Sequence, residues 1–443
     1  MPSKPQLEGE LFIALLLCVI VSGSNDSWEK RMPHLSITPL DALLDEPRRI
    51  CVEGLTAGQQ ITLTATTRRG AGQSWKSRAT FVADAQGIVD LQRDAPIAGD
   101  YAEVSGMGLL WSQRPQYEAS KEIFPDSVLE PLLTDVALSD SDQSMTLVQR
   151  LAGPGVSRRD IREDGLVGTL FMPAGDGPHP AVMVLNGSGG GINEARAALY
   201  ASRGYAALAL AYFKAPGLSK YISNTPLEYF QQALLWIRRE LKPENDFIAL
   251  SGQSRGGELV LLLGSLFPDL VSAVIGYVPS ALVHGGQAAA DPAIGRDGPA
   301  WLYRGQPLDH LWNNNRTASW EARDAGRRNA ESILTALDDP EAVARVAIEV
   351  ERIRGPVILL SGTDDAAWPS SLFGRMVEQR LKKHQHPWPV EHLDFQDAGH
   401  AILLPYIPAT YSDDGNPSAN ARANEQSWRG VRRFLEGALA TKR

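Results

Sequence analysis

Short apolar segments alternate with amphipathic segments along most of the chain after Gly165. Segments 181–185 (AVMVL) and 206–211 (AALALA) are continuous apolar runs of strand length, and 227–241 has the spacing of an amphipathic helix. Continuous apolar strands separated by helices indicate a mostly parallel sheet that helices cover on both faces. The sequence therefore predicts an α/β domain, which we assign to residues 141–443.

Other segments of this domain follow the same alternation. We expect strands at 246–250, 271–277 and 357–360, and helices at 194–203, 255–267 and 426–439. Residues 281–345 are polar and have too few strand signals for the sheet, so we interpret them as an excursion over its top.

The N-terminal part of the chain has a different pattern. Residues 34–140 contain short β-branched segments punctuated by glycines, without helical periodicity, which predicts a small β-sandwich. Residues 135–160 are polar and contain a Gly-Pro-Gly turn at 153–155, so they are expected to connect the two domains.

Residues 1–31 need a separate interpretation. Residues 11–21 form an apolar run of 11 residues. This is shorter than the roughly 20 residues that span a bilayer as a helix, but it suits a signal peptide of residues 1–23. Glu8 and Glu10 remove the positive bias that such a peptide needs. Two interpretations stay open: export, or a mis-assigned start with Met32 as the initiator of a cytoplasmic protein.

Composition excludes several classes of function. The chain has 443 residues, a net charge of −9 and two cysteines. A protein that binds nucleic acid normally carries a basic face, so we expect no nucleic-acid partner. Two cysteines cannot form a disulfide framework, and no Cys/His cluster has zinc spacing. We therefore expect a protein that acts on or binds small molecules, with no metal, no cofactor and no stable membrane insertion of the mature domain.

Residues 252–256 form a Gly-x-Ser-x-Gly motif centred on Ser254. The motif directly follows a predicted strand and precedes a predicted helix, which is the setting of a nucleophile on a sharp strand-to-helix turn. The helix N-terminus favours an anion that develops beside the serine oxygen. A glycine–serine turn without chemistry is the alternative, but this setting favours Ser254 as a nucleophile.

A base and an acid should follow Ser254 in the order serine, acid, histidine. His400 lies in a turn after the alternating segment 389–395, at the end of an expected strand, where a general base can reach the serine. The other downstream histidines are expected at the solvated surface or in the excursion: His384, His386 and His392 in the first group, His284 and His310 in the second.

The acid is expected in the loop after strand 357–360, where Asp364 and Asp365 are adjacent. Asp365 precedes an apolar–proline pair, Trp368-Pro369, by three residues, as the acid of this kind of site commonly does, so we favour Asp365. Asp364 remains the alternative. The carboxylate that does not orient His400 should cap the next helix or face water.

An oxyanion formed at Ser254 needs two backbone N–H donors. The N–H of Arg255 is one. The second should come from the loop after strand 181–185, at Gly187, Ser188 or Gly189, because glycines let the backbone approach a substrate carbonyl. This loop lacks a P-loop lysine and the Gly-x-Gly-x-x-Gly spacing, so it is not interpreted as a nucleotide site.

With these motifs, the chain resembles the acyl-CoA thioesterase / bile acid-CoA:amino acid N-acyltransferase family from about Leu35 to the C-terminus. The similarity lies in segments 37–39, 42–47, 99–101, 107–112, 168–173, 210–213, 226–230, 364–370 and 398–400. It implies an α/β-hydrolase domain preceded by a small Ig-like β-sandwich, with Ser254, Asp365 and His400 as a catalytic triad. The chain departs from the family in its N-terminal extension, in the length and polarity of 281–345, and in a C-terminus that is no peroxisomal address.

The resemblance implies hydrolysis of an acyl-CoA thioester to free acid and CoA through an acyl-serine intermediate. Amino-acid-conjugating members of the family tend to carry cysteine as the nucleophile, whereas this chain has Ser254. Two other activities stay open: a carboxylesterase, which an exported protein would favour, and an acyl-CoA:amino acid N-acyltransferase. A binding protein with an inactive hydrolase domain is a further alternative, but the presence of all three triad residue types argues against it.

Overall fold

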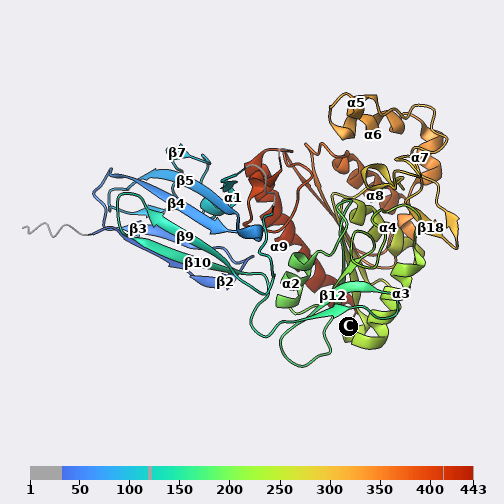
Figure 1. Cartoon of the computed structure of the whole chain (residues 1–443), viewed down its shortest axis with the longest axis horizontal. Helices are drawn as coiled ribbons and strands as arrows, with labels where there is room; N and C mark the ends of the chain where they lie inside the picture. The colour runs from blue at the N-terminus through green and yellow to red at the C-terminus, as the bar shows by residue number, and fades with distance from the viewer. Residues whose placement is uncertain (1–31, 118–121, 413, 443) are drawn as a thin grey trace, which may run out of the picture. The chain divides into compact units, whose positions relative to one another are not determined.

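An eight-stranded sheet organises the second half of the chain (Figure 1). The computed structural model describes residues 32–117, 122–412 and 414–442. The strand order of the sheet is β11-β12-β14-β13-β16-β17-β20-β21. Strand β12 is antiparallel to both of its neighbours, and the pairs from β14 to β21 are parallel. The strands are Ser157–Ile161 (β11), Val167–Met172 (β12), Ala181–Leu185 (β13), Ala206–Ala211 (β14), Ile248–Gln253 (β16), Ala273–Tyr277 (β17), Val357–Gly362 (β20) and Val390–Phe395 (β21).

Helices cover both faces of this sheet (Figure 1). They are α2 (Glu194–Ser202), α3 (Glu228–Trp236), α4 (Arg255–Leu266), α8 (Ser370–Lys383) and α9 (Pro417–Lys442). Val182 and Val184 of β13 pack in one core with α2 and α9. Met183 and Leu185 pack in another core with α3, α4 and α8. Because both faces are buried, the central strands have continuous apolar sequences, and the architecture is the predicted α/β-hydrolase fold.

Two helices differ from their predicted extents. The helix predicted at 227–241 is α-helical to Trp236 and then continues as a π-helical turn, Ile237–Leu241. The last helix begins at Pro417, well before the predicted start at 426. Asn416 caps it, because its Oδ1 accepts the N–H groups of Ser418 and Ala419 at 2.9 and 3.2 Å. The Asn-Pro pair was the missed signal, since proline is favoured at the first helical position.

The excursion (residues 281–345) lies between β17 and β20 and adds no strand to the eight-stranded sheet. Its first residues pair with the segment that directly follows it: the N–H of Val283 donates to the carbonyl oxygen of Val346, and the N–H of Ile348 donates to the carbonyl oxygen of Ala281, both at 3.0 Å. The excursion therefore leaves the domain and returns at one place. It contains α5 (Glu321–Asp324), α6 (Asn329–Leu337) and α7 (Pro340–Val346), and its strands β18 (Trp301–Tyr303) and β19 (Gln306–Pro307) form a small sheet with β15 (Thr225–Pro226).

The N-terminal half consists of two sheets, with strand orders β1-β3-β6 and β2-β10-β9-β4-β5-β7, the latter joined by β8. The strands are His34–Thr38 (β1), Asp41–Leu43 (β2), Arg49–Glu53 (β3), Gln60–Arg68 (β4), Ser74–Val82 (β5), Val89–Asp90 (β6), Ala98–Gly99 (β7), Arg114–Pro115 (β8), Leu132–Leu138 (β9) and Ser144–Arg150 (β10). The expectation that 135–160 is a connector was wrong, because β10 pairs with β9 and β2. The sheet of the first half thus extends to Arg150, beyond the boundary expected at 140.

Asp45 links the two halves. Its side chain is fully buried. Its carboxylate accepts hydrogen bonds from Arg203, the residue after α2, at 2.5 and 2.8 Å, and from Trp428 of α9 at 2.7 Å.

In the described part of the chain, no helix combines the length and apolar character needed to cross a membrane. Residues 1–31, interpreted above as a signal peptide or a mis-assigned start, lie outside the described residues.

Candidate active site

Ser254 lies on the turn between β16 and α4. Its φ of 58° and ψ of −117° are unusual for a residue with a side chain. The surrounding structure holds this conformation: the N–H of Ser254 donates to the oxygen of Tyr277 at 2.8 Å, and its carbonyl accepts the N–H of Glu258 at 3.0 Å. The turn directs the serine to the N-terminal end of the helix, as the motif predicted.

The glycines of the motif are required by space. A Cβ on Gly252 would lie 2.0 Å from the carbonyl oxygen of Gly256. A Cβ on Gly256 would lie 2.6 Å from the oxygens of both Leu185 and Asn186. The start of α4 therefore packs directly against the loop that follows β13.

The structure brings Ser254, His400 and Asp365 together. Ser254 Oγ lies 2.8 Å from His400 Nε2, and His400 Nδ1 lies 2.8 Å from Asp365 Oδ2. The other oxygen of Asp365 accepts the N–H groups of Ala367 and Trp368 at 2.9 and 3.2 Å, and the side chain is 1% exposed. The hydroxyl, imidazole and carboxylate thus form one continuous hydrogen-bonded chain.

Asp364 occupies a different position. Its carboxylate pairs with Arg328 of the excursion at 2.7 Å, and its side chain is 48% exposed. Of the two carboxylates that the sequence left open, only Asp365 contacts His400 among the described residues.

Opposing effects set the pKa of His400. Burial of the ring lowers it, but the carboxylates of Asp365 and Asp414 outweigh burial, so the pKa lies above its usual value of 6.5. Asp365 therefore both orients the ring and stabilises its protonated form.

The expected oxyanion donors lie beside Ser254. Arg255 is the first residue of α4, so its N–H has no acceptor within the helix. In the loop after β13, the N–H of Gly187 donates to Asn186 Oδ1 at 3.0 Å. Within the described residues, the backbone N–H groups of Ser188 and Gly189 donate no hydrogen bond. All three residues line the pocket beside Ser254, and a Cβ on Gly187 would lie 3.6 Å from Ser254 Oγ, so none of the three is excluded as the second donor.

A pocket of about 780 Å³ opens beside Ser254 and His400. The loop after β13 and the start of α2 form one side of it, and Leu403 and Tyr411 contribute to another. Residues 122–126 and Val128 of the N-terminal half also line it, and Ile123, Phe124 and Val128 are apolar. The buried Arg69 fixes this loop by donating to the oxygen of Ile123 at 2.7 Å. Both halves of the chain therefore shape the space around the serine.

The sequence analysis missed the buried side chains that support Arg255. The Arg255 guanidinium is 1% exposed, pairs with Glu258 at 2.7 Å and donates to the backbone oxygens of His284 and Gly285 in the excursion. Glu258 also accepts the indole N–H of Trp301 at 2.9 Å. Glu258 follows Ser254 by one helical turn, so the two residues lie on the same side of α4. This spacing in the sequence could have identified Glu258 as a neighbour of the site.

One histidine differs from its expected surroundings. His392 was expected at the solvated surface, but its side chain is 5% exposed and its Nε2 lies 2.7 Å from Ser361 Oγ. His284 and His310 belong to the excursion as expected, and both are buried. Sequence reasoning also assigned no role to Asp414, which accepts the backbone N–H of His400 at 2.8 Å.

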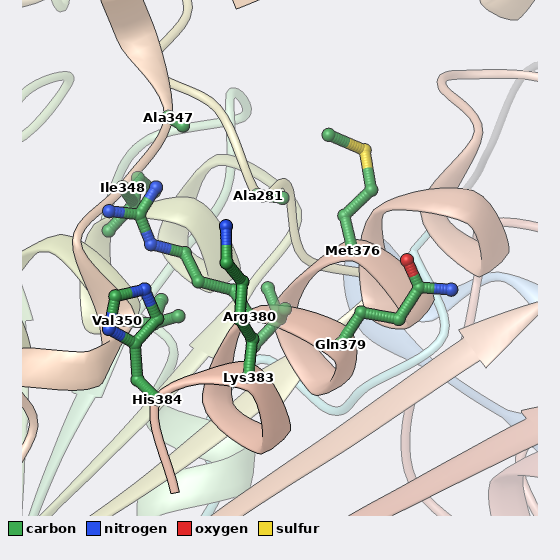
Figure 2. Close-up of a pocket in the computed structure, with 10 residues that line it drawn as sticks. Ala281, Ala347, Ile348, Val350, Met376, Gln379, Arg380, Lys383 and His384 are labelled. Atoms are coloured by element: carbon green, nitrogen blue, oxygen red, sulfur yellow. The ribbon is translucent and has the colours of Figure 1, made fainter. Parts of the chain in front are cut away.

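A second pocket, of about 390 Å³, lies where the two ends of the excursion meet α8 (Figure 2). Ala281, Ile348 and Arg380 are among the residues that line it. Arg380 is paired with Glu351 at 2.5 and 2.7 Å, so its charge is already compensated. This pocket shares no residue with the one at Ser254.

No group of three His, Cys, Asp or Glu side chains in the described residues is arranged to hold a metal ion.

The strand order and the serine turn define the chain as an α/β-hydrolase. More specifically, the chain belongs to the acyl-CoA thioester hydrolase/BAAT family. The model of the family's N-terminal region ("Acyl-CoA thioester hydrolase/BAAT N-terminal region") matches residues 45–163, and that of its C-terminal region ("BAAT / Acyl-CoA thioester hydrolase C terminal") matches residues 225–441.

Individual relatives are similar over nearly the whole chain. Acyl-coenzyme A thioesterase 2, mitochondrial, of Mus musculus is 30% identical over 95% of this chain and 93% of its own length. Acyl-coenzyme A amino acid N-acyltransferase 2 of Rattus norvegicus is 31% identical over 92% of this chain and 98% of its own. Among solved structures, an alpha/beta hydrolase enzyme from a deep-sea metagenome library aligns with a TM-score of 0.42 and 17% identity over 65% of this chain and 100% of its own.

Proposed function

We propose that the protein hydrolyses acyl-CoA thioesters to free acid and CoA, with Ser254, His400 and Asp365 as its catalytic triad. The observation that carries the proposal is the hydrogen-bonded chain from Ser254 Oγ through His400 to Asp365, with 2.8 Å at both steps, beside a pocket of about 780 Å³. Membership of a family that includes acyl-CoA thioesterases supports the choice of substrate.

Acylation begins with attack of Ser254 Oγ on the thioester carbonyl while His400 Nε2 accepts the hydroxyl proton. Asp365 stabilises the resulting imidazolium through Nδ1. The negative oxygen of the tetrahedral intermediate lies against the N–H of Arg255 and an N–H of Gly187, Ser188 or Gly189. His400 then returns the proton to the sulfur, the C–S bond breaks, and CoA leaves as a thiol.

Deacylation repeats these steps with water. His400 accepts a proton from water, the hydroxide attacks the acyl-serine ester, and the proton returns to Ser254 Oγ as the acid leaves. The apolar side chains of Ile123, Phe124 and Val128 offer a surface for the hydrocarbon part of the acyl group. The reaction consumes one thioester and one water and needs no cofactor.

A second candidate is transfer of the acyl group to an amino acid. The observation that favours it is the 31% identity to an acyl-coenzyme A amino acid N-acyltransferase over 98% of that protein. In that reaction the amine replaces water in deacylation, so products distinguish the two activities.

The test uses Ser254→Ala, with Ser219→Ala as a matched control because Ser219 is exposed and outside the pocket. Turnover of a long-chain acyl-CoA and of a p-nitrophenyl ester is measured. Loss of a serine nucleophile costs on the order of 10⁶-fold in kcat, so we expect Ser254→Ala to be inactive on both substrates and Ser219→Ala to keep the wild-type rate. The triad is wrong if Ser254→Ala retains more than about a tenth of that rate. Ester hydrolysis without acyl-CoA hydrolysis in the wild type would instead indicate a carboxylesterase.

A further inference from the structure

Asp414 joins the loop that carries His400 to the loop that carries Asp365. Its Oδ2 accepts the backbone N–H of His400 at 2.8 Å, and its Oδ1 accepts the backbone N–H of Ala366 at 3.0 Å. Ala366 directly follows Asp365. One carboxylate therefore holds the backbone next to the base and next to the acid at the same time.

Gly399 makes this contact geometrically feasible. A Cβ on Gly399 would lie 2.4 Å from the carbonyl oxygen of Asp414 and 2.8 Å from its Cγ. Any larger residue before His400 would push Asp414 away. The glycine of the Ala-Gly-His segment is thus explained by the close approach of Asp414.

Helix α9 fixes Asp414 from the other side. The buried Asn420 donates from Nδ2 to the carbonyl oxygen of Asp414 at 2.8 Å, and its Oδ1 accepts the N–H of Gly399 at 2.8 Å. Asp414, Gly399 and Asn420 consequently form one hydrogen-bonded unit behind His400.

The charges around this unit define the electrostatics of His400. The ring faces the carboxylate of Asp365 on one side, and its backbone is held by that of Asp414. Arg328 and Asp364 line the same surface depression as Asp414, but they pair with each other at 2.7 Å. Both oxygens of Asp414 accept N–H groups, which is the bonding of an ionised carboxyl.

We propose that Asp414 is a positioning residue of the active site, which holds His400 in register with Asp365 and Ser254 and whose negative charge stabilises the protonated imidazole. The inference rests on the proposed triad. It adds to that triad a second carboxylate that acts on the base through its backbone and its field rather than through the ring.

The test is Asp414→Asn, measured with a long-chain acyl-CoA and chromatographic detection of free CoA over a range of pH. An amide has one acceptor oxygen and a donor in place of the second, so it cannot accept both N–H groups. A small displacement of catalytic groups costs up to about 100-fold in rate. We expect kcat to fall at least tenfold with little change in KM, and the acid limb of the pH profile to move to lower pH because the protonated imidazole loses a stabilising charge.

Two control variants separate charge from structure. Asn420→Ala removes a support of the same loop but keeps the charge, so its kcat should fall while the acid limb stays at the wild-type pH. Asp397→Asn removes an exposed carboxylate three residues before His400 and should leave both kcat and the acid limb unchanged, since among the described residues its carboxylate accepts a side-chain hydrogen bond only from Gln396. The position of the limb does not depend on the amount of folded enzyme, so reduced stability would not obscure it.

The outcomes distinguish this inference from the proposed function. An inactive Ser254→Ala enzyme together with an unshifted acid limb in Asp414→Asn would overturn the role of Asp414 alone. Wild-type activity in Asp414→Asn would do the same. An active Ser254→Ala enzyme would overturn the triad and this inference with it.

Discussion

Asp364 and Asp365 are neighbours in the sequence, but their carboxylates point to different partners. Asp365 Oδ2 lies 2.8 Å from His400 Nδ1, whereas Asp364 Oδ1 lies 2.7 Å from Arg328 of the excursion. The buried carboxylate meets the imidazole and the half-exposed one meets a surface cation. This separation makes the two positions a matched pair for mutation.

Asp365→Asn should therefore damage catalysis far more than Asp364→Asn. An amide opposite Nδ1 can hold the wrong imidazole tautomer, which costs on the order of 10⁴-fold in kcat in a serine protease triad. Loss of an exposed ion pair is worth only about 0–1 kcal/mol of stability, so Asp364→Asn should keep nearly full activity. Both variants are compared by kcat on one acyl-CoA. Equal losses, or a larger loss in Asp364→Asn, would transfer the role to Asp364.

The pH dependence of the wild type should reflect the raised pKa of His400. The imidazole must be neutral to accept the proton of Ser254, so kcat/KM falls as pH drops through that pKa. Asp365 and Asp414 place it above the usual value of 6.5, despite the opposing effect of burial. We expect the half-maximal rate on the acid side above pH 6.5, measured by initial rates with a long-chain acyl-CoA in overlapping buffers. A midpoint below that value would mean that burial dominates.

The residues and strands that lie where sequence reasoning expected them are those with a local signature. Ser254 has its motif, β13 and β14 have continuous apolar sequences, and the order serine, acid, histidine restricts the partners. The side chains that it missed have no such signature. The carboxylate of Asp414 accepts the backbone N–H of His400, and the Arg255 guanidinium donates to the backbone oxygen of His284 in the excursion.

Strand β10 shows a different limit. Residues 144–150 alternate only partly between exposed and buried positions, and their polar members made them resemble a connector. The strand is fixed by pairing with β9 on one side and β2, far away in sequence, on the other. His392 was misplaced for a similar reason, because its polar neighbours in sequence do not show that β20 and α8 enclose it.

Gly256→Ala should disturb both stability and activity. The added Cβ would lie 2.6 Å from two backbone oxygens of the segment that leads into the loop after β13. Backbone cannot yield as a flexible side chain does, and overpacking of this kind typically costs about 1–3 kcal/mol. Displacement of that loop also moves the expected oxyanion donors, so we expect kcat to fall at least tenfold and the melting temperature to drop.

Gly437→Ala is the matched control for this effect. Gly437 lies within α9, and a Cβ there would meet nothing within 4 Å. Alanine in a helix interior is favoured over glycine by about 1 kcal/mol. This variant should melt at the same or a higher temperature and keep its activity. Similar behaviour of the two variants would refute the steric argument for the serine turn.

The nucleophile should decide between water and amine as the acceptor of the acyl group. An acyl-Ser254 intermediate is an oxygen ester, whereas an acyl-cysteine is a thioester and reacts more readily with amines. With wild-type protein, an acyl-CoA and excess glycine or taurine, we expect free acid and little amide, because His400 activates water for deacylation. Ser254→Cys should hydrolyse more slowly and form a larger share of amide. Chromatography of the products measures both, with Ser219→Ala as the control for substitution itself. Predominant amide from the wild type would make the protein an acyltransferase, and an unchanged amide share in Ser254→Cys would show that the nucleophile does not set the choice.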